Sequence, residues 1–230
     1  MNRVILSAST DETILAVTRQ HKLVDLEIEQ QINTEIVGCI YKGVVKNIVP
    51  AVDGIFVDIG IGKNAFLRRK DLLNEKRFPT EGSPILAQVI KSDTDMKGAL
   101  ITEKISMFGK YAVTLSGTGY IGVSKKIRQE SVRKRLKEIG KEICAEHMGL
   151  IIRTAAENAD MDEFRKDITR LKENWDIIQK RFRMEKSPTL LYRESDIIVK
   201  ALRDYVNKGT EILITDNRKI YERICKLNES

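Results

Sequence analysis

The chain has 230 residues, of which 42% are hydrophobic and 32% are charged, a balance that excludes wholesale disorder and suits one or two globular cores. Forty Lys and Arg residues against 33 Asp and Glu residues give a formal net charge of +7, which favours contact with polyanions such as nucleic acid. The N-terminus lacks the layout of a signal peptide, and no apolar run approaches the length of a membrane span.

The first half of the chain is typical of β structure. Apolar residues alternate along 2–7 and 12–29, on either side of a polar break, which predicts an opening β-hairpin or meander. Between 36 and 103, short Val- and Ile-rich runs are separated by Gly and Pro, a pattern typical of a small barrel. One helical turn is expected near 69–75.

Two further strands are expected at 110–116 and 119–124, then a charged helix at 128–144 and a strand at 148–155. A long helix follows, because apolar residues recur at steps of four and three along one stripe: Phe164, Ile168, Leu171, Trp175, Ile178 and Phe182. We interpret this stripe as core, and the charged face opposite as solvated surface with some ion pairs within the helix.

The C-terminal part predicts an α/β layer with one clear strand: a helix at 194–206, the strand at 211–216 and a helix at 217–227. A layer with one strand is incomplete, so this strand must pair with the N-terminal strands or with a missing segment. The barrel and the helical region are therefore expected to be inserted between two halves of one α/β unit.

The segment IYKGVVKNIVPAVDGIFVDIGIGKNAFLRRKDL resembles the S1-motif RNA-binding domain, a five-stranded OB-fold barrel. An isolated Phe in a strand is usually a core residue, but the ordered motif favours Phe56 and Phe66 as an outward-facing platform for bases. A cationic track along the RNA backbone is expected from four lysines: Lys42, Lys46, Lys63 and Lys97.

In GLIIRTAAENA, an Arg and a Thr lie at the end of a predicted strand. The planar guanidinium of Arg153 matches phosphate oxygens, and the hydroxyl of Thr154 can donate at short range, so a terminal phosphate could bind there. The alternative is an ordinary surface pair at a strand end.

Six strings occur in the order found in the ribonuclease E/G family: GIFVDIG, ISMFGKYAVTL, GVSKKI, GLIIRTAAENA, LLYRESDIIVKALRDYV and GTEILITDNRKIYERI. The chain thus resembles the N-terminal portion of that family. The resemblance implies an α+β fold with an S1-type OB-fold barrel (36–104) and an α/β 5′-sensor region (105–196), both inserted in a truncated RNase H-like α/β region (1–35 and 197–230). The implied function is binding of single-stranded RNA, preferably 5′-monophosphorylated, as part of an endoribonuclease of RNA processing and decay.

The resemblance also implies which residues bind RNA. In the barrel they are Phe56, Phe66 and Lys97, and in the 5′-phosphate sensor they are Gly109, Val113, Lys125, Arg153 and Thr154. Lys125 stands where many family members have Arg, which keeps the charge but removes planar bidentate contact.

No catalytic residue, metal site or cofactor is expected in this chain. In the family, magnesium is held by two aspartates of a DNase I-like domain C-terminal to these residues, and a zinc link farther downstream joins subunits. We therefore expect a monomer that is inactive alone. Other candidates form no cluster suited to metal or acid–base chemistry: His21, Asp53, Asp58, Asp93, Asp95 and His147.

Cys39, Cys144 and Cys225 are too far apart for a zinc knuckle or a disulfide framework, which fits a cytoplasmic protein. Two alternatives to a non-catalytic part of a nuclease stay open. One is a free-standing RNA-binding regulator built from the same modules, and the other is an intact nuclease with an unidentified site. Whether the reading frame continues past Ser230 separates the first alternative from a nuclease fragment.

Overall fold

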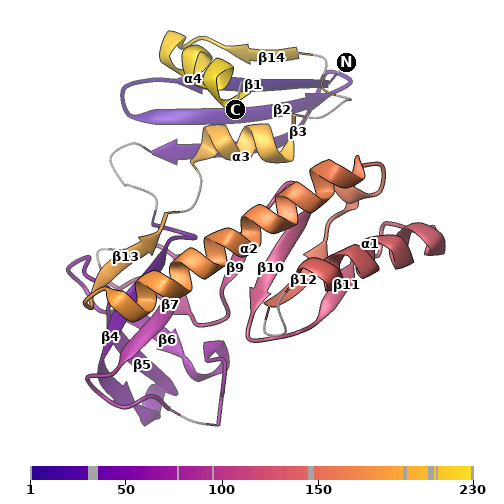
Figure 1. Cartoon of the computed structure of the whole chain (residues 1–230). Helices are drawn as coiled ribbons and strands as arrows, with labels where there is room; N and C mark the ends of the chain where they lie inside the picture. The colour runs from indigo at the N-terminus through magenta and orange to yellow at the C-terminus, as the bar shows by residue number, and fades with distance from the viewer. Residues whose placement is uncertain are drawn as a thin grey trace. The chain divides into compact units, whose positions relative to one another are not determined.

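The structure, a computed structural model, describes residues 2–30, 36–76, 78–94, 96–144, 148–193, 196–206, 210 and 212–228. The chain forms two compact units (Figure 1): Met1–Ile36 joins Ser195–Ser230 in one, and Val37–Glu194 makes the other. The two ends of the chain therefore fold together, and the remainder is inserted between them. Each helix in the described part of the chain is too short or too polar to cross a membrane.

The discontinuous unit is built on a four-stranded sheet in the order β14-β1-β2-β3. Its strands are β1 (Asn2–Ala8), β2 (Glu12–Arg19), β3 (Lys22–Gln30) and β14 (Ile212–Thr215). The first three form the expected antiparallel meander, whereas β14 runs parallel to β1, with Ile214 opposite Ile5. The C-terminal strand thus pairs with the N-terminal strands, which is the first of the two pairings that the sequence left open.

Helices α3 (Ile197–Asp204) and α4 (Arg218–Asn228) cover one face of this sheet. The core combines alternate residues of β1 and β2 with one side of each helix: Val4, Leu6, Leu15, Val17, Ile197, Ile198, Ala201, Ile220 and Ile224. On the opposite face the register aligns Leu26, Ala16, Ile5 and Ile214 across the four strands. Leu26 and Ile214 are exposed there, so among the described residues the helices of this unit cover only the opposite face.

The inserted unit contains a closed five-stranded barrel, as expected. Its strands are β4 (Ile40–Val49), β5 (Gly54–Asp58), β6 (Ala65–Arg68), β7 (Pro84–Lys91) and β8 (Leu100–Thr102). They pair in the order β4-β5-β6-β8-β7, and β7 pairs back to β4, which closes the barrel. The expected helical turn is present as a short 3₁₀ turn at Arg69–Asp71.

A second sheet of this unit has the order β11-β12-β10-β9. Its strands are β9 (Ser106–Phe108), β10 (Ala112–Ser116), β11 (Ile121–Val123) and β12 (Met148–Ile152). Helices α1 (Glu130–Ile143) and α2 (Met161–Met184) pack against it (Figure 1). The predicted core stripe of α2 is confirmed, because Phe164, Ile168, Leu171 and Ile178 are buried and Trp175 and Phe182 pack partly buried beside them. On its charged face, Lys172 and Asp176 form an ion pair of 2.8 Å.

Side-chain and strand contacts join the barrel to this second sheet. The side chain of Gln88 on β7 is buried; its Nε2 donates to the carbonyl of Ser106 at 2.8 Å, and its Oε1 accepts from the N–H of Ser106 at 2.8 Å. Strand β13 (Thr189–Tyr192), which follows α2, pairs antiparallel with β4. The barrel strand β4 is therefore covered along its first half by the chain returning from α2.

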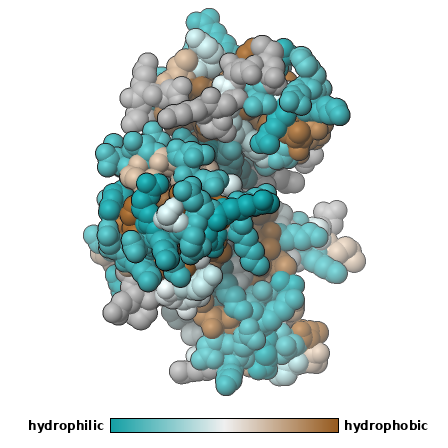
Figure 2. All heavy atoms as spheres, turned by 90° about the vertical axis from the view of Figure 1, so that its right-hand side faces the viewer, coloured by the Kyte–Doolittle hydropathy of each residue, from teal (hydrophilic) through white to brown (hydrophobic). Residues whose placement is uncertain are grey.

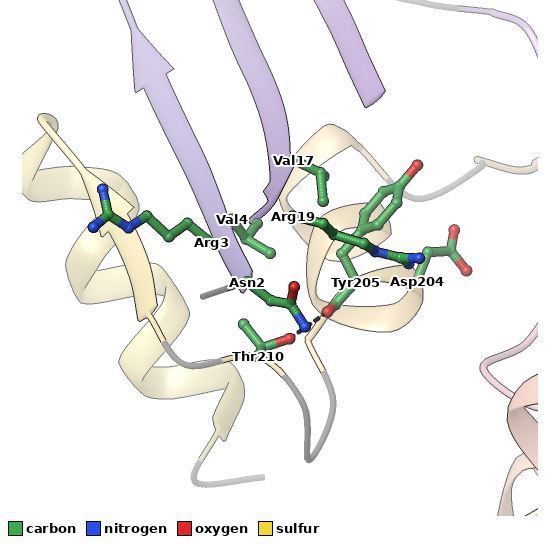
Figure 3. Close-up of a pocket in the computed structure, with 8 residues that line it drawn as sticks. All are labelled: Asn2, Arg3, Val4, Val17, Arg19, Asp204, Tyr205 and Thr210. Carbon is green, nitrogen blue, oxygen red and sulfur yellow. Dashed lines mark hydrogen bonds between the residues drawn. The ribbon is translucent and has the colours of Figure 1, made fainter. Parts of the chain in front are cut away.

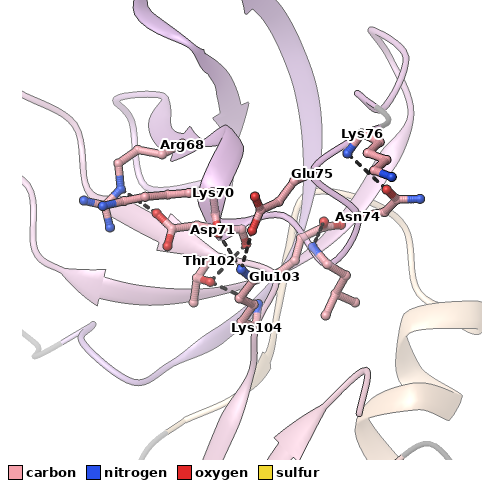
Figure 4. A network of polar contacts seen from close by, with 10 residues as sticks. Arg68, Lys70, Asp71, Asn74, Glu75, Lys76, Thr102, Glu103 and Lys104 are labelled. Carbon is pink, nitrogen blue, oxygen red and sulfur yellow. Dashed lines mark hydrogen bonds and ion pairs between the residues drawn. The ribbon is translucent and has the colours of Figure 1, made fainter.

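A polar network fixes the segment between β8 and β9 (Figure 4). Thr102 Oγ1 donates to the carbonyl of Asp71 at 3.1 Å, and Lys104 Nζ lies 3.0 Å from Glu75 Oε1. Glu103 Oε2 accepts from the N–H of Leu73 at 2.9 Å. Burial raises the pKa of Glu103, and this hydrogen bond lowers it by less.

Candidate functional site

The first candidate site lies on the barrel, where Phe56 of β5 and Phe66 of β6 are directly opposite each other. Their ring centroids are 5.4 Å apart and their planes are tilted by 49°. A Cβ atom on Gly54 would lie 2.3 Å from Cε2 of Phe66, so only glycine lets this ring lie over β5. Both rings are half-buried and form one paired aromatic surface.

These rings line a groove of about 660 Å³, which also contains Lys97 of the β7–β8 connection. Backbone hydrogen bonds between Thr94 and Lys97, of 2.8 and 3.3 Å, hold that connection in a tight loop. Lys63 Nζ donates to the carbonyl of Thr94 at 3.0 Å. All three residues assigned to RNA contact in the barrel therefore meet in one groove, with an apolar base and a cationic rim.

The expected track of four lysines is only partly present. Lys42 is the clearest correction: it is 9% exposed, its Nζ donates to the carbonyl of Glu185 at 2.6 Å, and it lies 5.0 Å from the ring centroid of Phe182. The pairing of β13 with β4 directs this side chain to the end of α2. Lys46 forms an ion pair of 3.5 Å with Asp58, whose carboxylate also accepts from the N–H of Gly60 at 2.9 Å, as expected for a turn residue.

The second candidate site lies at the end of β12. Arg153 Nη1 donates to the carbonyl of Gly109 at 2.8 Å, and its backbone N–H donates to the carbonyl of Tyr111 at 2.7 Å. Thr154 Oγ1 lies 3.1 Å from Ser124 Oγ, beside the exposed Lys125. Four of the five predicted sensor residues thus lie near the end of β12. Arg153 and Thr154 follow this strand directly, and Gly109 and Lys125 lie in two adjoining loops.

Val113, the fifth predicted sensor residue, lies on β10 opposite Ile151 of β12, two residues before Arg153. Its side chain is partly exposed, on the sheet face away from the buried neighbours Ala112 and Thr114. It supplies an apolar surface next to the polar residues at the strand end.

The sequence did not reveal Asp167 of α2, although it is central to this site. Its carboxylate is 7% exposed and accepts from the N–H groups of Lys110 at 3.2 Å and Tyr111 at 2.8 Å. Arg170 Nη2 lies 2.9 Å from it. The sequence signal that could have identified Asp167 is its position next to Ile168 on the buried side of the predicted helix. A buried carboxylate requires hydrogen-bond donors around it.

Tyr111 is held by α2 as well. Its hydroxyl donates to Glu163 at 2.5 Å, and burial together with the Glu163 carboxylate raises its pKa far above the usual range. The loop at 109–111, which carries Gly109, is thus fixed to α2 through Tyr111 and Asp167.

No group of three or more His, Cys, Asp or Glu side chains is arranged to hold a metal ion among the residues that the structure describes. Asp53 pairs with Arg69 at 2.5 Å, and His21 occupies the turn between β2 and β3 with a φ of 65°. Asp95 and His147 lie outside the described residues.

A smaller pocket of about 150 Å³ lies in the discontinuous unit and is lined by residues of β1 and β2 and the end of α3 (Figure 3). Arg19 and Asp204 line it, and Thr210 Oγ1 donates to the carbonyl of Tyr205 at 2.6 Å. The hydroxyl of Tyr205 donates to Asp25. Its described lining residues include no nucleophile next to a base.

Residues 106–230 match the sequence model of the "Ribonuclease E/G family", and residues 34–102 match that of the "S1 RNA binding domain". The chain belongs to the ribonuclease E/G family. Its barrel is accordingly an S1-type OB fold, a kind of domain that binds RNA, as the resemblance implied.

Similar members of the ribonuclease E/G family extend well beyond this chain. Ribonuclease G of Escherichia coli K12 is 32% identical over 97% of the chain, which spans 49% of that relative. Ribonuclease G of Haemophilus influenzae is 31% identical over 98% of the chain and 50% of the relative. Ribonuclease E of Buchnera aphidicola (subsp. Schizaphis graminum) is 31% identical over 96% of the chain and 25% of the relative. The chain therefore spans about half the length of these ribonuclease G proteins.

Proposed function

We propose that this chain binds single-stranded RNA in the barrel groove and holds a 5′-monophosphate at the end of β12, as the RNA-gripping part of an endoribonuclease of RNA processing and decay. The observation that carries RNA binding is the groove shared by Phe56, Phe66 and Lys97. Stacking on an aromatic ring contributes about 1 to 3 kcal/mol per base and tolerates any sequence. Two adjacent rings therefore account for affinity without sequence preference.

Recognition of the 5′ end is proposed from the residues that follow β12. A guanidinium carries five N–H donors in a planar fork, and the bond to Gly109 fixes its direction. The hydroxyls of Thr154 and Ser124, 3.1 Å apart, supply short-range donors, and Lys125 adds a positive charge. Together they suit a phosphate with two negative charges better than an uncharged 5′-hydroxyl end.

The test is fluorescence-anisotropy binding of one RNA sequence carrying either a 5′-monophosphate or a 5′-hydroxyl, with the Arg153→Ala variant alongside. The chain should prefer the monophosphate, and Arg153→Ala should remove that preference while retaining binding to the 5′-hydroxyl RNA. Arg153→Lys keeps the charge but loses the planar fork, so it should retain only part of the preference. Equal binding of both ends by the unchanged chain contradicts the 5′-sensing part of the proposal and leaves RNA binding by the barrel intact.

In this proposal the chain alone binds RNA as a cytoplasmic monomer without cleaving it. Cys39, Cys144 and Cys225, all in the described part of the chain, form no disulfide, which agrees with a reducing compartment. Incubation of RNA with purified chain and Mg²⁺ should leave the RNA intact. Cleavage that a single substitution in the chain abolishes would contradict the non-catalytic role.

A further inference from the structure

The sheet β11-β12-β10-β9 has one face turned toward α1 and α2 and one face turned away from them. A Cβ atom on Gly140 of α1 would lie 3.2 Å from Leu150 Cδ2 and 3.6 Å from Ile152 Cδ1, so these two side chains of β12 point toward α1. Side chains alternate along a strand. Ile151, which lies between them, therefore projects from the opposite face.

One row of side chains crosses this opposite face from edge to edge. Phe108 of β9 is opposite Val113 of β10, and Val113 is opposite Ile151 of β12. Residues directly opposite each other project from the same face. Gly122 of β11 is opposite Ile151, and a Cβ atom on Gly122 would lie 2.7 Å from Cε1 of Tyr120. The ring of Tyr120 thus takes the place of a side chain at Gly122, and these four side chains form what we call the open-face row.

The open-face row is apolar and largely accessible to solvent. Tyr120 is 63% exposed, Phe108 44% and Ile151 39%, and Val113 is partly exposed. Figure 2 shows a side of the molecule on which hydrophilic residues predominate. Single exposed apolar residues are common on such a surface, whereas a contiguous group marks an interaction site. A row with an aromatic ring at each end indicates a ligand with planar, apolar parts.

The open-face row adjoins the proposed 5′-phosphate site. Arg153 lies two residues beyond Ile151, and its extended backbone (φ −83°, ψ 162°) keeps its side chain on the same face. Two residues of a strand span about 7 Å. The guanidinium of Arg153 donates to the carbonyl of Gly109, the residue after Phe108, at 2.8 Å. A nucleotide whose phosphate binds Arg153 therefore has the open-face row within reach of its base.

We propose that the open-face row is a stacking surface for the first bases of an RNA whose 5′-phosphate is held at the end of β12, with Phe108 and Tyr120 as its two ring positions. The proposal rests on the proposed 5′ sensing and extends it from the phosphate to the bases. Neighbouring strands lie about 4.8 Å apart, so three strand spacings separate the two rings by roughly 14 Å, which leaves room for more than one base. Aromatic rings on a sheet surface also stack bases in other RNA-binding domains.

A second copy of the chain is the alternative occupant of an apolar sheet face. The cations beside the open-face row favour RNA: Arg153 projects from the same face, and Lys125 is exposed in the loop after β11. A second copy that covered this face with its own would bring like charges together, which is unfavourable. RNA instead brings a phosphate to the cations and its bases to the rings.

The test is anisotropy with the full chain and a 5′-monophosphorylated RNA of about 24 nucleotides, longer than the site of one OB fold. One form of the RNA has all its bases, and the other is abasic at its first three nucleotides. Removing these bases should weaken binding to the unchanged chain by at least about fivefold, which corresponds to one stacked base. Tyr120→Ala and Phe108→Ala should each weaken the intact RNA by a similar factor and the abasic RNA by less than about twofold, because an abasic end cannot stack. Tyr120→Phe restores the ring and should recover the loss.

Tyr221→Ala is the matched control, because Tyr221 is 61% exposed on α4 in the other unit, and it should leave both affinities unchanged. Equal losses for the intact and the abasic RNA, or no loss in either ring variant, overturn the stacking surface. A dimer in sedimentation experiments that Tyr120→Ala dissociates also overturns it and identifies a second copy as the occupant. The failure of 5′ sensing is distinct, since the unchanged chain then binds 5′-monophosphate and 5′-hydroxyl RNA equally. Circular dichroism spectra check that each variant is folded.

Discussion

Asp167 lies so close to Gly109 that a Cβ atom on the glycine would come within 2.4 Å of Asp167 Oδ2. The same carboxylate accepts from the N–H groups of Lys110 and Tyr111, so α2 fixes the loop whose carbonyl at Gly109 accepts from Arg153. A helix that carries no proposed phosphate ligand thus determines where the guanidinium points.

Gly109→Ala should therefore disturb the proposed phosphate site without removing any of its polar side chains. The added methyl group displaces either the loop or the Asp167 carboxylate, and Arg153 loses its fixed direction. The expected result is a smaller preference for 5′-monophosphate over 5′-hydroxyl RNA by anisotropy, with binding of the 5′-hydroxyl RNA retained. An unchanged preference would show that the position of Gly109 is not needed for phosphate binding.

Asp167→Ala should destabilise the inserted unit, because it leaves the buried N–H of Tyr111 and the partly buried N–H of Lys110 without their acceptor. The expected loss is about 2 kcal/mol or more in the free energy of unfolding. Trp175 is the single tryptophan of the chain and packs beside this core, so its fluorescence in urea reports the transition. Glu173→Ala removes an exposed carboxylate of the same helix and should change the midpoint little; equal effects of the two variants would contradict a structural role for Asp167.

The two aromatic rings of the barrel groove should each contribute to RNA affinity. Phe56→Ala or Phe66→Ala should weaken binding by about 5- to 150-fold, the range that corresponds to about 1 to 3 kcal/mol per stacked base. Phe78→Ala is a matched control, because this ring stacks 3.9 Å from the guanidinium of Arg69 and does not line the groove. Comparable losses in all three variants would argue against specific stacking in the groove.

Glu103 should make the inserted unit less stable as the pH rises. Its pKa is raised in the folded state by burial, so folding favours the protonated form. The stability that the raised pKa of Glu103 contributes is fully present below the ordinary glutamate pKa of 4.5. It is lost as the pH rises through the raised pKa of the folded state. Glu103→Gln retains an oxygen acceptor for the N–H of Leu73 without the charge. The variant should gain stability relative to the unchanged chain between pH 5 and pH 7 in urea titrations; a constant difference across that range would contradict this linkage.

The discontinuous unit should open more readily than the barrel. The described helices of this unit pack on one face of its sheet, and Leu26, Ile28 and Ile214 are more than a third exposed on the other face. Less buried apolar surface lowers the free energy of local opening. Hydrogen exchange should therefore be faster in α3, β14 and α4 than in β4, β5 and β7 of the closed barrel. Uniform protection through both units would be evidence against this difference.

The sequence by itself determined features that depend on residues near one another in the chain. Alternation predicted the N-terminal meander, and steps of four and three predicted the buried stripe of α2. The ordered S1 motif predicted one platform formed by Phe56 and Phe66, whose positions are paired across two strands in the structure. Secondary structure and its buried face follow from such local periodicity, because a helix or strand repeats within a few residues. The hydrogen bond from the N–H of Gly60 to Asp58 is equally local, because the two residues are two positions apart.

Only the tertiary structure decided which distant residues meet. Lys42 was expected to face RNA, but it donates to the carbonyl of a residue 143 positions away in the chain, because β13 pairs with β4. The bonds of Asp167 to Lys110 and Tyr111 span 57 and 56 positions, and the pairing of Gln88 with Ser106 joins the barrel to the second sheet. A buried polar group takes whichever partner the packing brings to it, and no local pattern encodes that partner.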